Sequence, residues 1–142
     1  MVSGDGKEGK VYAVDVQKDL LDKLKNEANR EHLTNIEIIW GNIEKIGGTK
    51  IRDGLCDVAI ASNVFFQVED RKGFAGEVYR ILKPTGRLFF IEWADSFGGI
   101  GPTPETVFGK KEAEKFFPQN GFVVEKEVSV GSHHYGLVIR KK

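Results

Sequence analysis

One acid, Asp15, closes the first clean apolar run of the chain, Lys10 to Asp15, and an amphipathic segment follows it directly. In an open sheet of parallel strands, ligands bind outside the carboxyl ends of the strands, where an acid can accept hydrogen bonds from both hydroxyls of a ribose. Asp is also a favoured residue at the start of a helix, where its side chain caps backbone N–H groups. Position alone therefore leaves two roles open for Asp15, a ribose ligand and a helix cap.

Three residues near the C-terminus could transfer a proton. His133 and His134 lie in a turn between two predicted strands, and Tyr135 follows them. Imidazole titrates near neutrality, so one of these side chains could line a substrate pocket or act as a general base if the turn lies at the ligand edge of the sheet. Neighbouring residues of an extended segment point to opposite faces, which makes the two histidines a poor pair of metal ligands. Exposure to solvent in an ordinary turn is the alternative.

Strand and helix patterns alternate along the chain and predict how these residues are positioned. Helical spacing of apolar residues predicts helices at 18–30, 70–82 and 110–119, and apolar runs predict strands at 10–15, 36–40, 55–61, 87–93, 122–130 and 135–140. This order predicts a single α/β domain, 1–142, with a Rossmann-like, mostly parallel sheet and helices on both faces. The last two strands predict a C-terminal antiparallel hairpin. The glycine- and proline-containing segment 94–108 is long enough to form a mobile substrate lid.

The composition indicates no charged or membrane partner. The 142 residues include 21 basic and 21 acidic ones, so no excess of positive charge favours binding to nucleic acid or to an anionic membrane. The single cysteine, Cys56, excludes an intrachain disulfide and fits a reducing compartment. The sequence contains neither the ~20 consecutive apolar residues of a membrane helix nor the apolar core of a signal peptide. We therefore expect a cytoplasmic protein.

The first ten residues are predicted to form a loop, because Gly4, Gly6 and Gly9 lie among polar residues. The spacing from Gly4 to Gly9 matches G-x-G-x-x-G, but that phosphate-binding motif needs a preceding strand and a following helix. Here no strand precedes and a strand follows, so the match is interpreted as a surface turn. The missing phosphate-binding turn also argues against a nicotinamide-dependent dehydrogenase, which would likewise place an acid after its second strand.

Four short motifs occur in an order and spacing that resemble one enzyme family. They are V-Y-A-V-D at 11–15, G-N-I at 41–43, D-V-A-I-A-S-N-V at 57–64 and L-K-P-T-G-R-L at 82–88. With the closing hairpin, the chain resembles the class I S-adenosylmethionine-dependent methyltransferases, in the branch that includes the ubiquinone/menaquinone methyltransferases. The resemblance covers nearly the whole chain, from Gly9 to Lys142.

The resemblance implies S-adenosylmethionine as the cofactor and assigns its nucleoside to the ends of the first two predicted strands. Asp15 would bind the ribose hydroxyls, and Val16 and Ile43 would pack against the adenine. Asn42, after Gly41, would meet the amino edge of the adenine, where the family usually carries Asp, and its carbonyl can accept that hydrogen bond. An ordinary turn at Gly41 and Asn42 is the alternative.

The resemblance assigns the methionine end of the cofactor to the residues that directly follow the predicted central strand, 55–61. Ser62 and Asn63 would face the methionine part or the substrate, and Gln67 would help to shape the substrate side. An ordinary helix-capping pair at Ser62 and Asn63 is the alternative.

The chain departs from the family at its N-terminus. The family begins with a strand, a glycine-rich loop and a helix that cradle the methionine end of the cofactor, and such a unit needs roughly thirty residues. Only ten residues precede Val11, so this first βα unit is predicted to be missing. In the family's sheet the first strand lies between the strands of Asp15 and Ala61, and its absence would leave two central edges unpaired. Either those strands pair directly, or a homo-oligomer or an exchanged strand fills the gap.

Methyl transfer from a sulfonium needs little acid–base machinery when the acceptor is already nucleophilic, because holding the partners at near-attack distance supplies much of the rate. The sequence accordingly predicts neither a catalytic triad nor a metal site. The predicted function is S-adenosylmethionine-dependent methyl transfer to a small molecule. A non-catalytic binding or interaction module that has lost the methionine cradle is the alternative.

Overall fold

The computed structural model describes residues 2–4 and 9–142 and places strands and helices close to the predicted ranges. The first half of the chain contains β1 (Val2–Gly4), β2 (Val11–Asp15), α1 (Lys18–Arg30), β3 (Ile36–Trp40), β4 (Cys56–Ser62) and the short helix η1 (Phe65–Gln67). The second half contains α2 (Arg71–Ile81), β5 (Leu82–Trp93), α3 (Lys110–Phe116), the short helix η2 (Pro118–Asn120), β6 (Phe122–Val128) and β7 (His134–Lys141).

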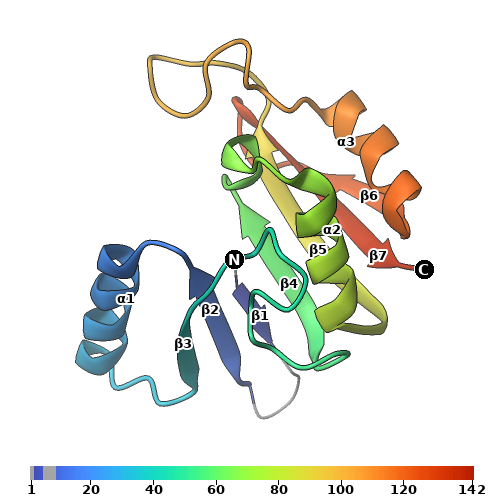
Figure 1. The fold of residues 1–142 in the computed structure, drawn as a ribbon. Coiled ribbons are helices and arrows are strands. Elements are labelled where there is room, and N and C mark those ends of the chain that lie inside the picture. The colour runs from blue at the N-terminus through green and yellow to red at the C-terminus, as the bar shows by residue number, and fades with distance from the viewer. Residues whose placement is uncertain (1, 5–8) are drawn as a thin grey trace.

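The strands form one sheet in the order β3-β2-β1-β4-β5-β7-β6 (Figure 1). The pairs β2–β3 and β4–β5 are parallel, and β7 is antiparallel to both β5 and β6. The predicted α/β class and the C-terminal antiparallel hairpin are therefore confirmed. Because β7 lies between β5 and β6, β6 runs in the same direction as β4 and β5, and the turn before β7 lies at the carboxyl edge of the sheet.

The centre of the sheet differs from the sequence prediction. Residues 2–4, predicted to be loop, form β1, which pairs antiparallel with β2 on one side and with β4 on the other. The backbone groups of the two central edges are therefore paired within the chain, and β2 and β4 do not pair directly. The family's first strand, which leads into the glycine-rich loop, would run parallel to β2 and β4. The direction of β1 is the opposite one. The predicted surface turn within the glycine motif falls on residues 5–8, outside the described residues.

The helices bury the apolar stripes that the sequence indicates, with one exception. Phe74, Val78 and Ile81 of α2 are fully buried, and the helix ends ahead of Pro84, which cannot continue it. In α1, which lies against β2 and β3 (Figure 1), Leu21 is buried, whereas Leu20 is 47% exposed. The Leu20 side chain lines a pocket instead of the core.

A cluster of aromatic rings holds η1 in place at the carboxyl edge of β4. The fully buried Phe65 ring lies 4.5 Å from the Phe108 ring, 5.2 Å from the Phe74 ring and 5.3 Å from the Phe90 ring, measured between centroids. Edge-to-face and tilted aromatic pairs of this kind add to the stabilisation from buried area. The cluster joins η1 to α2, to β5 and to the end of the irregular segment 94–108. Within the described residues, no helix is long and apolar enough to cross a membrane.

Candidate functional site

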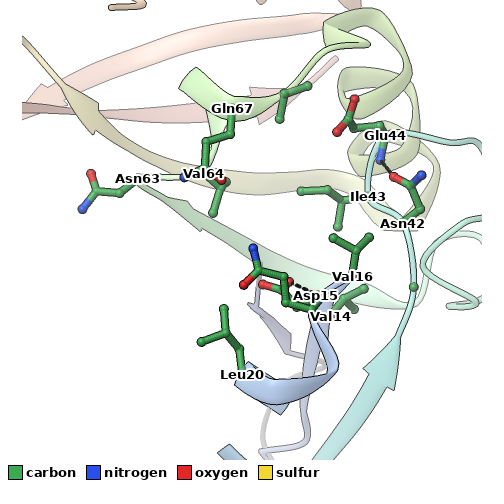
Figure 2. Close-up of a pocket in the computed structure, with 13 residues that line it drawn as sticks. Val14, Asp15, Val16, Leu20, Asn42, Ile43, Glu44, Asn63, Val64 and Gln67 are labelled. Carbon is green, nitrogen blue, oxygen red and sulfur yellow. Dashed lines mark hydrogen bonds between the residues drawn. The ribbon is translucent and has the colours of Figure 1, made fainter. Parts of the chain in front are cut away.

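A pocket of about 480 Å³ opens where the carboxyl ends of β2, β3 and β4 meet (Figure 2). It is lined by Val14, Asp15, Val16, Gln17, Leu20, Gly41, Asn42, Ile43, Glu44, Asn63, Val64, Gln67 and Val68. Seven of the eight predicted cofactor-binding residues are in this set. The exception is Ser62, which is exposed and lies two residues beyond Ile60 on the same face of β4, directed away from the pocket-facing residues.

Asp15 lies at the end of β2 with one carboxylate oxygen in use. Its Oδ1 accepts a hydrogen bond from the Gln17 N–H at 2.8 Å, and Gln17, not Asp15, is the N-cap residue of α1. The helix-cap role is therefore not the one that Asp15 has in the structure. Asp15 Oδ2 accepts no hydrogen bond from the described part of the chain, so an acceptor remains at the pocket wall.

The loop after β3 forms a tight turn that places Asn42 and Ile43 opposite Asp15. The Gly41 N–H donates to the Asp15 carbonyl at 3.0 Å, and the Asn42 N–H donates to the Gly48 carbonyl at 2.9 Å. A Cβ at Gly41 would lie 2.4 Å from the Gly48 carbonyl oxygen, so only glycine fits there. The Asn42 side-chain carbonyl accepts from the Glu44 N–H at 2.9 Å (Figure 2), which leaves it one further lone pair for a ligand.

Apolar side chains on the wall of the pocket that follows β2 and β3, here called the near wall, are accessible to solvent. Val16 is 56% exposed and Leu20 is 47% exposed, and Ile43 faces the same space (Figure 2). The Trp40 Nε1–H donates to the Val16 carbonyl at 2.9 Å and fixes the backbone there. Accessible apolar groups beside hydrogen-bonding groups are typical of a site for a planar, partly apolar ligand.

The opposite wall, formed by the Asn63–Gln67 segment after β4 and here called the far wall, carries a strained residue with an unpaired polar atom. Asn63 has φ = +58°, a left-handed conformation that Asn tolerates better than most residues. Its Oδ1 is buried and accepts no hydrogen bond within the described residues. Strain of this kind concentrates at functional sites, and an unpaired buried acceptor can be satisfied by a bound polar group.

A buried carboxylate that the sequence analysis missed fixes this far wall. Glu92, near the end of β5, is fully buried, and its Oε1 accepts from the N–H groups of Phe65 at 2.9 Å and Phe66 at 3.1 Å. Burial raises the pKa of Glu92, and the backbone donors oppose that shift. The only sequence signal was an acid inside an otherwise apolar strand. Glu92 therefore joins η1 to β5 and holds the Asn63–Gln67 segment at the pocket.

The three residues predicted to be catalytic lie at the carboxyl edge of the sheet but do not line this pocket. His133 Nδ1 is 3.1 Å from Asp95, and the His133 ring stacks on Phe97 at 3.8 Å between centroids. The His134 ring is 4.2 Å from the Trp93 ring. Tyr135 is buried, and its hydroxyl donates to the Phe108 carbonyl at 2.5 Å. The structure brings all three into contact with the segment 93–108 instead of with Asp15 and Asn42.

Burial raises the pKa of Tyr135, so its phenol stays neutral at physiological pH. We expect Tyr135→Phe to lower the free energy of unfolding by about 1–2 kcal/mol, because the Phe108 carbonyl loses its buried donor. The affinity of the pocket for a ligand should stay within about twofold of the wild-type value. Urea denaturation and ligand titration of the same sample measure both quantities. A large loss of affinity at unchanged stability would instead assign Tyr135 to the site.

Within the described residues, no group of three or more His, Cys, Asp or Glu side chains could hold a metal ion. The site thus consists of two carboxylates, those of Asp15 and Glu44, together with amide side chains, backbone groups and accessible apolar side chains. Such a set can bind and orient a nucleoside-like molecule. The six lining residues that the sequence analysis did not select are Val14, Gln17, Leu20, Glu44, Val64 and Val68. Most of them neighbour a selected residue in the sequence, which was the available signal.

Comparison with known families identifies the family to which this nucleoside-binding type of pocket belongs. Residues 3–90 match the family described as "Methyltransferase domain". The chain belongs to this methyltransferase family. The matched residues include all seven predicted cofactor-binding residues that line the pocket.

Similar proteins agree with this family and differ from the chain in length. An arsenite methyltransferase from Aquipseudomonas alcaligenes is 32% identical over 91 residues, which are 61% of this chain and 26% of that protein. The chain therefore matches only about a quarter of the length of this curated relative.

Solved structures of methyltransferases share the fold. A SAM-dependent methyltransferase from Aquifex aeolicus superposes with a TM-score of 0.85 at 28% identity, covering 96% of this chain and 71% of that one. The trans-methyltransferase CalH, solved in complex with SAH, superposes with a TM-score of 0.74 at 20% identity, covering 92% of this chain and 42% of that one. At that identity the second likeness concerns the fold alone.

Proposed function

We propose that this methyltransferase domain, residues 1–142, binds S-adenosylmethionine in the pocket between β2, β3 and β4 and transfers its methyl group to a small molecule. The observation that carries the proposal is the meeting of Asp15, Asn42 and Asn63 around one pocket, each with a side-chain acceptor able to take a further hydrogen bond. When bound, S-adenosylmethionine supplies an electrophilic methyl group on a sulfonium sulfur.

Different residues of the pocket fit the ribose, the adenine and the methionine part of this cofactor. Asp15 Oδ2 would accept from the ribose hydroxyls, and Val16 and Ile43 would pack on the adenine. Asn42 would meet the base edge with the free lone pair of its carbonyl. Asn63 and Gln67 would face the methionine part or the acceptor. These groups bind and orient; holding the reactants close is the contribution that such a transfer needs most.

The acceptor is proposed only as a small molecule. Arsenic(III) favours soft thiolate ligands, and the only thiol of this chain, Cys56, is fully buried inside β4. Nothing in the described residues therefore favours arsenite, the acceptor in the name of one relative. The ubiquinone/menaquinone branch, the cytoplasmic location and a homo-oligomeric state stay predictions from the sequence.

The pocket also bears on the alternative of a non-catalytic module. A collapsed or obstructed pocket would favour that alternative. Here β1 completes the centre of the sheet, and the pocket is open and lined by Asp15 and Asn42. The catalytic role is therefore the favoured one.

Isothermal titration of the purified chain with S-adenosylhomocysteine, S-adenosylmethionine and NADH tests the proposal. We expect one saturable site for the first two ligands and no heat with NADH. Binding followed by transfer of a labelled methyl group to candidate acceptors would establish turnover. A folded chain that binds neither sulfur ligand would overturn the proposal.

A further inference from the structure

Helix α2 touches the pocket-forming loop so closely at one residue that only glycine fits there. A Cβ at Gly73 would lie 2.0 Å from the Glu44 carbonyl oxygen. Gly73 thus lets the backbone of the loop, residues 41–49, lie directly on the first turns of α2. Since glycine weakens a helix interior by comparison with alanine, its presence here indicates that the close approach is needed.

Two carboxylates hold the same loop against α2. Glu44 Oε1 accepts from the backbone N–H groups of Glu69 at 3.0 Å and Asp70 at 2.8 Å, just ahead of the helix. From the helix side, the fully buried Glu77 accepts from the Gly47 N–H at 2.7 Å and from the Thr49 hydroxyl at 2.6 Å. The loop is therefore attached to α2 at both ends of its contact.

The attached loop carries the wall of the pocket that faces the base. Asn42, Ile43 and Glu44 all line the pocket (Figure 2). The Asn42 N–H donates to the Gly48 carbonyl, which lies within the segment that Glu77 holds. A shift of the loop relative to α2 would move Asn42 and Ile43 relative to Asp15, which is on β2. The relative position of the two walls therefore depends on α2, although none of the described pocket-lining residues belongs to that helix.

We infer that α2 positions the base-side wall of the pocket, with Gly73 and Glu77 as positioning residues that set the affinity for the nucleoside part of the cofactor. The inference rests on the proposed function for the ligand, and on the described contacts alone for the position of the loop.

The test compares two alanine substitutions on the same helix. In Gly73→Ala the new methyl group meets the Glu44 carbonyl, whereas in Gly76→Ala it meets only the tip of the exposed Ile46 side chain, 2.8 Å from Cδ1. Both replace a glycine of α2 with alanine, which has the higher helix propensity. We expect Gly73→Ala to raise the dissociation constant for S-adenosylhomocysteine at least tenfold and Gly76→Ala to change it less than twofold.

Asp70→Ala provides a second control. The added methyl at Gly73 would also lie 2.6 Å from Asp70 Oδ2, and Asp70 caps α2 by accepting from the Gly73 N–H at 2.8 Å. Asp70→Ala removes that cap and leaves the Glu44 contact intact, so we expect little change in affinity. An equal loss of affinity in Asp70→Ala and Gly73→Ala would show that the cap, and not the loop contact, matters, and would overturn the inference.

Amide hydrogen exchange of the ligand-free chain separates this inference from the proposed function. Exchange at Asn42, Gly47 and Thr49 should be faster in Gly73→Ala and unchanged in Gly76→Ala. That result supports the inference even if the wild-type chain binds no S-adenosylhomocysteine. Unchanged exchange and affinity in a folded Gly73→Ala chain would refute it.

If Gly73→Ala does not fold, Thr49 carries the test. Thr49→Val keeps the shape and removes the hydroxyl that Glu77 accepts from, and Thr49→Ser restores it. Faster loop exchange and weaker binding in Thr49→Val, rescued in Thr49→Ser, support the inference. Equal behaviour of the two variants opposes it.

Discussion

Replacing Asp15 with alanine is expected to weaken the binding of S-adenosylhomocysteine about 100-fold. A hydrogen bond to a charged group contributes about 1.5–3 kcal/mol, so loss of the bonds to two ribose hydroxyls should cost at least about 3 kcal/mol. Every 1.4 kcal/mol corresponds to a tenfold change in dissociation constant. Isothermal titration of the wild-type and variant chains measures the change directly.

The matched control is Asp19→Ala, in the first turn of α1. Asp19 is an exposed acid four residues along the chain and is not among the lining residues. Asp19→Ala removes the same negative charge close to the same site, so it corrects the measured affinity change for long-range electrostatics. Asp15→Ala also removes the bond from the Gln17 N–H, which should lower stability by only about 1 kcal/mol. Equal affinities of the two variants would exclude Asp15 from the binding site.

Replacing Glu77 with alanine is expected to lower the free energy of unfolding by about 3–5 kcal/mol, a large part of the ~5–15 kcal/mol typical of a domain. Glu77 is fully buried, and Arg80 donates to its two carboxylate oxygens at 2.8 Å each from Nε and from a terminal nitrogen. Removing the carboxylate leaves the guanidinium and the Thr49 hydroxyl without this partner. Urea denaturation at pH 7 measures the loss.

The control for Glu77 is the other acidic partner of Arg80. Asp53 is 2.6 Å from Arg80, but its side chain is 83% exposed, and exposed ion pairs contribute about 0–1 kcal/mol. Asp53→Ala should therefore change stability by less than about 1 kcal/mol. A Glu77→Ala chain as stable as Asp53→Ala would show that the buried ion pair is energetically neutral.

Stability should also depend on pH through Glu77. Burial by itself raises the pKa of Glu77, but hydrogen bonds from Arg80 and Thr49 outweigh it and lower the pKa from 4.5 to about 2. Because the folded pKa lies below the ordinary value, the contribution is complete above pH 4.5 and is lost as the pH falls toward 2. The wild-type chain should therefore lose more stability between pH 5 and about 2.5 than Glu77→Ala does. Parallel curves for the two chains would contradict this prediction.

Local sequence signals were sufficient for the elements and for most of the pocket. Helical spacing predicted α1 over its observed range, Lys18–Arg30, and the apolar run at Ile36–Trp40 predicted β3. Parallel strands bring their carboxyl ends to one edge of the sheet. Residues at or beyond the ends of β2, β3 and β4 could therefore be expected to meet, and all the predicted cofactor-binding residues except Ser62 line the pocket.

The local sequence did not predict features that depend on partners far away in the chain. Residues 2–4 have no strand pattern of their own; they form β1 because the edges of β2 and β4 offer backbone partners on both sides. Glu77 and Glu92 look like ordinary acids in the sequence, and their burial depends on donors 26 to 30 residues away. His133, His134 and Tyr135 lie at the predicted edge, but their neighbours are Asp95, Trp93 and the Phe108 carbonyl.

The sequence by itself determined the α/β class, the family and the residues that end each strand, because hydrophobic period and short motifs are local properties of a chain. Only the tertiary structure decided how the centre of the sheet is completed, which buried acids hold the pocket walls, and that α2 supports the loop of Asn42. Those features depend on close approach and hydrogen bonding between segments far apart in the chain. Long-range contacts of that kind leave almost no mark on the local pattern of residues.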